Sequence, residues 1–85
     1  MITLHEFFTN HNWGQGTLYS RFTDSYCMLG GIHKISNTGE EKQRLTNAVA
    51  EACKKEFGIT FIAIANDNRI KSKEQLLAFL LKHNL

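Results

Sequence analysis

The sequence contains no proline, and it has only two cysteines, a small net charge and no long hydrophobic run. Without proline, no segment resembles a stiff linker between domains. The longest apolar run, Phe61 to Ala65, is far shorter than the roughly 20 residues of a transmembrane helix. The segment from Met1 to Glu6 lacks the basic and apolar regions of a signal peptide. We therefore expect a soluble protein without a membrane segment.

The charge balance and the cysteine content narrow the class of protein further. Ten Lys and Arg residues against eight Asp and Glu residues leave +2, which is too little to indicate a nucleic-acid-binding protein. The basic cluster of Arg69, Lys71 and Lys73 could contact phosphates, but acidic residues interleave with it, so a solvated surface is expected. Cys27 and Cys53 do not form the dense framework of a secreted, disulfide-rich scaffold. Both thiols are expected to stay reduced, in the cytoplasm.

The length of 85 residues and an ordinary globular composition, with 42% hydrophobic and 21% charged residues, predict one domain over residues 1–85. A domain of this size buries only about 60–65% of the surface that its unfolded chain exposes. Such a small core leaves little room for a deep cavity. We expect no cofactor of the dinucleotide or haem type.

Three helix starts share one chemical signature. The segments Thr3 to Glu6, Thr38 to Glu41 and Ser72 to Gln75 match the capping box. In this motif a hydroxyl accepts from the third amide, and the Glu or Gln side chain reaches back. Each match opens an apolar segment with helical spacing, and Gly58 stands where a left-handed helix cap is expected.

A further helix is predicted from the apolar spacing between Cys27 and Ile35, although Gly30 and Gly31 lie inside it. Each interior glycine costs about 1 kcal/mol relative to alanine, so we expect another backbone to approach closely there. The predicted fold is mainly α, with about four helices and at most a small two-stranded β element. The helices cover roughly residues 3–11, 27–35, 39–57 and 73–84, and the strands lie around residues 17–22 and 59–65. Periodicity alone leaves open whether residues 59–65 form a strand or a short buried helix.

Three short motifs occupy the middle of the chain: Trp13-Gly14-Gln15-Gly16, Cys27-Met28-Leu29-Gly30-Gly31 and Asn66-Asp67. In this order and over most of the chain, they resemble a family of small uncharacterised domains from bacterial and phage genomes. That family shares a Trp-x-Gln-Gly, a Cys-x-Leu-Gly-Ala and an aromatic-Asn-Asp followed by a final helix. The chain departs from the pattern at Gly31, which replaces Ala, and at Ala65, which replaces the aromatic residue. The resemblance implies a fold but brings no established activity.

Cys27 is the candidate nucleophile of the chain. A thiol at a helix start has its thiolate stabilised by the helix dipole. With His5 or His11 as a base and Asp67 as an orienting carboxylate, it would resemble a cysteine hydrolase. His33 lies on another side of the same helix and cannot pair with it locally. The reading that we favour is a small buried residue.

Trp13, Gln15 and Asp67 also allow two readings. They could line a shallow cleft that senses a small ligand through an aromatic ring, an amide and a carboxylate. Alternatively, they could tie a long loop to the rest of the domain by hydrogen bonds, which is the reading we favour.

A metal site is not expected. No closed zinc-type spacing occurs among the possible ligands, which are His5, His11, His33, His83, Cys27 and Cys53.

The leading hypothesis is a small non-enzymatic accessory protein that acts by contacting another protein. Its candidate binding residues lie in the loop before Cys27, where Tyr19, Arg21 and Phe22 are typical interface anchors. Trp13, Gln15 and Asp67 are further candidates for binding. The resemblance adds the possibility of a phage-encoded protein directed at a host machine. Leucines of the last helix leave a homodimer open; they are Leu77, Leu81 and Leu85.

Overall fold

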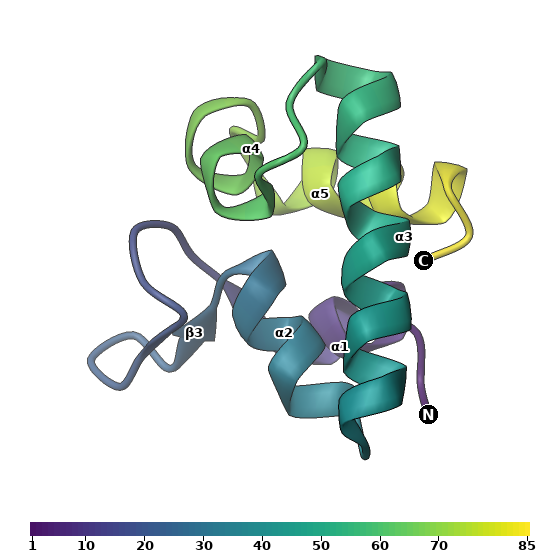
Figure 1. Ribbon diagram of the computed structural model, residues 1–85. Coiled ribbons are helices and arrows are strands. Elements are labelled where there is room, and N and C mark those ends of the chain that lie inside the picture. Colours follow the sequence, from purple (N-terminus) through teal and green to yellow (C-terminus); the bar gives the residue numbers. More distant parts are fainter.

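The computed structural model describes residues 1–85 and shows a mainly α protein with a small sheet. The elements in chain order are α1 (Leu4–Asn10), β1 (Asn12–Trp13), β2 (Tyr19–Ser20), β3 (Ser25–Tyr26), α2 (Met28–Ile35), α3 (Gly39–Phe57), α4 (Ile62–Asn68) and α5 (Lys73–Lys82). In Figure 1, α3 stands upright, α1 and α2 lie towards its lower half, and α4 and α5 lie towards its upper half. The strands and their loops project beyond α2, on the side away from α3.

The three predicted capping hydroxyls are confirmed. Thr3, Thr38 and Ser72 each accept a hydrogen bond from the amide three residues on, at 3.0, 3.1 and 3.1 Å. Gly58 ends α3 with φ 71°, the left-handed conformation expected there, and its N–H donates to the Lys54 carbonyl. Helix α3 has the predicted bounds, 39–57. The other three predicted helices begin and end within two residues of their predicted bounds.

The paired glycines of α2 are explained by two close approaches. A Cβ built on Gly30 would lie 2.0 Å from the backbone oxygen of Leu18, so the loop backbone presses directly on the helix. The same oxygen accepts from the Cys27 amide at 3.2 Å. A Cβ on Gly31 would lie 2.8 Å from the ring of Phe8, which packs there from α1. The expectation that another backbone approaches these glycines is therefore confirmed at Gly30.

Two parts of the predicted fold are wrong. Residues 59–65 do not form a strand, because the second half of this segment begins a fifth helix, α4. Within 17–22 only Tyr19 and Ser20 are extended, and they pair antiparallel with Ser25 and Tyr26 rather than with residues 59–65. The central strand β3 also pairs in parallel with β1, so the sheet has three strands and not two. A short buried helix was the alternative left open for this segment, and α4 realises it from Ile62 on. Its N-cap, Phe61, has no capping side chain that could have decided between helix and strand.

Every helix contributes to one hydrophobic core. Its largest fully buried side chains come from α1, α2, α3, α5 and the turn before α5, and they include Phe8, Met28, Val49, Ile70 and Leu80. Burial raises the pKa of the Cys53 thiol to about 11, since the apolar surroundings disfavour the thiolate.

No helix combines the length and the apolar character that crossing a membrane requires.

The close approach at Gly30 predicts a large effect of one methyl group. Gly30→Ala should lower the free energy of unfolding by about 2–3 kcal/mol, because the new Cβ must displace backbone rather than a flexible side chain. Urea denaturation followed by circular dichroism measures it. Gly39→Ala is the matched control: it adds a Cβ to helix α3 in open space and should be neutral or mildly stabilising. Equal effects of the two substitutions would contradict the packing described here.

Candidate functional site

The side chain of Asn66 is fully buried and makes four hydrogen bonds. Its Oδ1 accepts from the indole Nε1–H of Trp13 at 2.7 Å and from the amide of Met28 at 3.0 Å. Its Nδ2 donates to the Gly14 carbonyl at 3.1 Å and to Oδ1 of Asp67 at 3.0 Å. Two donors face the amide oxygen and two acceptors face the amide nitrogen, so the bonding capacity of the group is used. We call these five residues the Asn66 network.

The end of α4 is held by the loop that follows Trp13. The two hydrogens of Gln15 Nε2 face three backbone carbonyls, those of Asn66, Asp67 and Ile70, at 3.1, 3.1 and 2.9 Å, so that one hydrogen is shared. The amide of Gly16, which has φ 87°, donates to Oδ1 of Asp67 at 3.0 Å. The final carbonyls of a helix have no partner within it, and Gln15 supplies one.

The structure thus brings Trp13, Gln15 and Asp67 together, as the loop-tying interpretation expects. The residue that connects them is Asn66, which the sequence presents only as half of the short Asn66-Asp67 motif. A buried asparagine on an apolar helix face has no spacing signature of its own. The available signal was the helical spacing of Ile62, Ala65 and Asn66, which places the amide on the buried face.

Cys27 is buried and acts as the N-cap of α2. Its Sγ accepts from the amide of Gly30 at 3.4 Å, and no histidine makes a hydrogen bond to it. His11 bonds through Nδ1 to the Phe7 carbonyl at 2.9 Å and stacks on the Phe7 ring. His5 lies on α1, part-buried, and its side chain makes no hydrogen bond. No histidine is therefore hydrogen-bonded to the thiol, and the carboxylate of Asp67 accepts from Gly16 and Asn66.

The other candidate ligands and charges lie apart. The structure gathers no group of three or more His, Cys, Asp or Glu side chains that could hold a metal ion. In the basic cluster, Lys73 donates to the His11 carbonyl at 3.0 Å, whereas the side chains of Arg69 and Lys71 are exposed. Among the leucines considered for a dimer, Leu81 is exposed, and Leu77 and Leu85 pack partly against the core.

A polar pocket of about 710 Å³ lies beside the Asn66 network. Trp13 and Gln15 line it together with hydroxyl side chains and Lys73, but Asp67 does not. Part of its polar lining is already bonded internally: Thr23 and Ser25 share a 2.7 Å hydrogen bond, and Gln15 Nε2 faces α4.

Residues 18–24, which we call the loop tip, contain the most exposed large hydrophobic side chain of the protein. Phe22 is 91% exposed, and the guanidinium of Arg21 lies 6.0 Å from the centre of its ring. Tyr19 donates from its hydroxyl to Asp24 at 2.8 Å, and its ring lies 4.7 Å from that of Tyr26. The hydrogen bond to the Asp24 carboxylate raises the pKa of Tyr19. The base of the loop tip is therefore held by the contacts of Tyr19 with Asp24 and Tyr26. At its end, Phe22 is exposed to solvent.

No family model, curated protein or solved structure matches the chain. Its function is therefore argued from its own geometry.

The Asn66 network predicts a severe loss of stability on truncation. Asn66→Ala should lower the free energy of unfolding by about 3 kcal/mol or more, since it leaves buried groups of Trp13, Met28 and Gly14 without partners. Chemical denaturation measures the loss, and the single tryptophan reports the altered environment of the indole by fluorescence.

The matched control is Asn68→Ala on the same helix. Asn68 is exposed and its side chain makes no hydrogen bond, so its removal should change stability by less than about 0.5 kcal/mol. An Asn66→Ala protein as stable as the Asn68→Ala protein would show that the network does not hold the fold.

Burial of both thiols predicts slow chemical labelling. Ellman's reagent should modify Cys27 and Cys53 at least about 100-fold more slowly in the native protein than in denaturant, since labelling requires opening of the structure. Cys27→Ser assigns the signals and should keep the fold, because serine is a good N-cap. Rapid native labelling that disappears in Cys27→Ser would instead reveal an accessible, reactive Cys27.

Proposed function

We propose that the protein is a non-enzymatic binding module that contacts another protein through its loop tip. The observation that carries this proposal is the exposure of Phe22, 91% of whose surface faces solvent, next to Arg21 and Tyr19. Aromatic and arginine side chains are enriched where proteins bind one another. Nothing in the fold of the domain itself requires a phenylalanine at this position.

The anchoring of the loop supports the same proposal. The Asn66 network fixes the start of the loop, and β3 fixes its return to α2. Asn12 adds a hydrogen bond from Nδ2 to the Thr23 carbonyl at 3.3 Å. A loop held at its base loses less conformational entropy on binding than a free loop does. The exposed side chains are thus presented on a pre-ordered support.

The surroundings of Cys27 favour this reading over a cysteine hydrolase. The sulfur caps a helix inside the domain, and no base is bonded to it. A nucleophilic thiol needs both an accessible face and a neighbouring base.

A small-ligand site is the second candidate, and the 710 Å³ pocket beside Trp13 is the observation that favours it. We place it second because the N–H groups of Trp13 and Gln15 that would bind a ligand already donate to Asn66 and Asp67 at the end of α4. From the resemblance to bacterial and phage domains, we propose a protein of a host machinery as the partner.

The proposal predicts that two side chains of the loop tip control partner binding. Arg21→Ala/Phe22→Ala should retain its stability within about 0.5 kcal/mol, because both side chains are exposed, and should lose at least about tenfold in partner recovery. The measurement is quantitative mass spectrometry after cross-linking of the full chain in cells that encode it.

Phe61→Ala is the matched control, because Phe61 is also a largely exposed phenylalanine, at the start of α4. It should keep the partners that the loop-tip variant loses. Equal recovery of every partner by the wild type, the Phe61→Ala variant and the loop-tip variant would refute binding through the loop tip.

A further inference from the structure

A shallow groove lies between the loop tip and α2. Its volume is about 250 Å³, and its lining consists of Leu18, Tyr19, Tyr26, Gly30, His33 and Lys34. Its lining is largely apolar: the Tyr19 and Tyr26 rings lie 4.7 Å apart, and Gly30 contributes no side chain. The close approach at Gly30 fixes the position of Leu18 over α2. The groove is therefore continuous with the loop tip and has the size of one or two apolar side chains.

Among Lys, Arg, Asp and Glu residues, Lys34 is the one that lines this groove. Lys34 and His33 form one edge, and no carboxylate lines the groove. One carboxylate lies close by: Asp24 accepts from the hydroxyl of Tyr19 at 2.8 Å and keeps its negative charge. Arg21 extends the positive charge towards Phe22.

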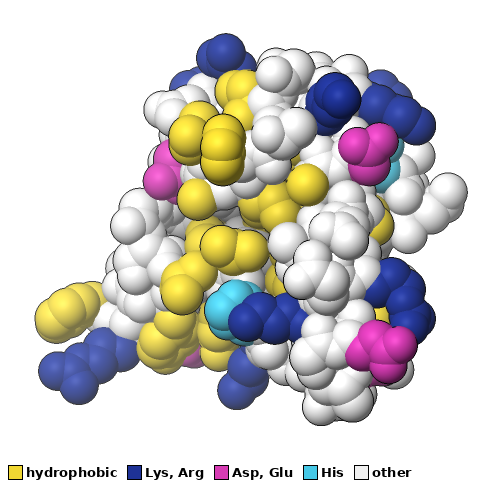
Figure 2. Space-filling view, viewed as in Figure 1, with side chains coloured by type: hydrophobic (Ala, Val, Ile, Leu, Met, Phe, Trp, Pro, Cys, Tyr) yellow, Lys and Arg dark blue, Asp and Glu magenta, His cyan; other side chains and the backbone are white.

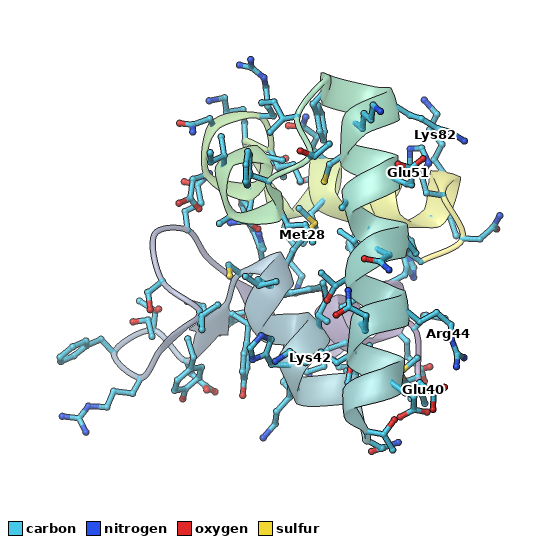
Figure 3. All side chains as sticks on the ribbon, in the orientation of Figure 1. Met28, Glu40, Lys42, Arg44, Glu51 and Lys82 are labelled. Atoms are coloured by element: carbon cyan, nitrogen blue, oxygen red, sulfur yellow. The ribbon has the colours of Figure 1, made fainter.

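Figures 2 and 3 show the side chains on the face that carries α2 and the loop. On the face shown in Figure 2, hydrophobic side chains, a histidine and basic side chains lie together over α2 and the loop. In Figure 3, Lys42 lies on the α2 side of α3, whereas Glu40 and Arg44 point to the opposite side. The ion pairs of the structure join Glu56 to Lys82 and His83, so Lys34 and Arg21 are free to meet charges of a partner.

We propose that this groove binds an acidic segment of the partner protein, seating one of its apolar side chains between Tyr19, Tyr26 and Lys34. The inference rests on the proposed function and specifies the chemistry of the partner. Complementary charge steers such an encounter and fixes its register. An apolar anchor in a small pocket with charged groups at its rim is the usual arrangement of a peptide site.

The same charges argue against a second copy of this chain as the occupant. A symmetric dimer places the same patch of both copies face to face. Arg21 and Lys34 of one copy would then lie near the identical groups of the other, and such like-charge pairing is unfavourable.

Selection from a random dodecapeptide display library on the immobilised full chain tests this proposal. The selected peptides should be enriched in Asp and Glu flanking one large apolar residue. A labelled peptide from the selection, followed by fluorescence anisotropy, should bind Lys34→Glu at least about tenfold more weakly than the wild type. In ¹⁵N spectra, the same peptide should shift the amides of Tyr26, Gly30 and His33.

Lys54→Glu is the matched control, because Lys54 is also an exposed lysine in the last turn of a helix. It should bind the peptide as the wild type does. Equal weakening in both variants would reflect net charge alone and would overturn the proposal.

Other outcomes overturn it as well: no enriched peptide, peptides without acidic residues, or shifts that map away from the groove. Self-association of the chain that Lys34→Glu abolishes would assign the groove to a second copy. Binding to phosphatidylserine vesicles, without any peptide binding, would assign it to an anionic lipid surface. Loss of the natural partner by Arg21→Ala/Phe22→Ala but not by Lys34→Glu would leave the proposed function standing and would refute this inference alone.

Discussion

The buried amide of Asn66 is the interaction on which the arrangement of this protein depends. One amide group joins the loop at Trp13 and Gly14, the start of α2 at Met28 and the end of α4 at Asp67. These segments are far apart in the sequence, and short strands of two residues could not hold them together. Burying an amide is favourable only when its polar atoms are bonded, so the three segments must be in register at the same time.

Once that register is set, the other close contacts follow. The loop returns along β3 into Cys27, whose backbone amide bonds to Leu18, and Gly30 allows the Leu18 carbonyl to touch α2. The N–H groups of Trp13 and Gln15, which could otherwise bind a ligand, donate to Asn66 and Asp67 and so anchor the loop. The exposed side chains that remain lie beyond the anchored base, at the loop tip and along the groove beside α2. The same constraint that stabilises the fold therefore also presents the exposed Phe22.

The sequence predicts those elements whose signals are local. Thr3, Thr38 and Ser72 identify helix starts because a capping hydroxyl acts within one helical turn, and Gly58 identifies a helix end for the same reason. The glycines of α2 also indicated a close approach, although the sequence did not say that the neighbour was Leu18.

Helix α4 and the Asn66 network could not be predicted in this way. The apolar segment before Asn66 begins at Phe61 without a capping side chain, and a run of β-branched residues fits a strand as well as a short helix. The partners of Asn66 are brought to it by tertiary packing. The pair Asn66-Asp67 therefore has the appearance of an ordinary turn, and the adjacent Gln15 gives no sign that it binds the end of a helix. A small β element was predicted, and its segment 17–22 contains β2. Strands β1 and β3 were missed because a strand of two residues has no recognisable alternating pattern.

Hydrogen exchange of the Trp13 indole N–H, followed by NMR in the native protein, tests the central role of Asn66 most directly. If this proton is bonded to the buried amide as the structure shows, its exchange should be as slow as that of the most protected helix amides and should track global unfolding. An indole proton that exchanges at the rate of a free peptide, while the helices remain protected, would contradict the account.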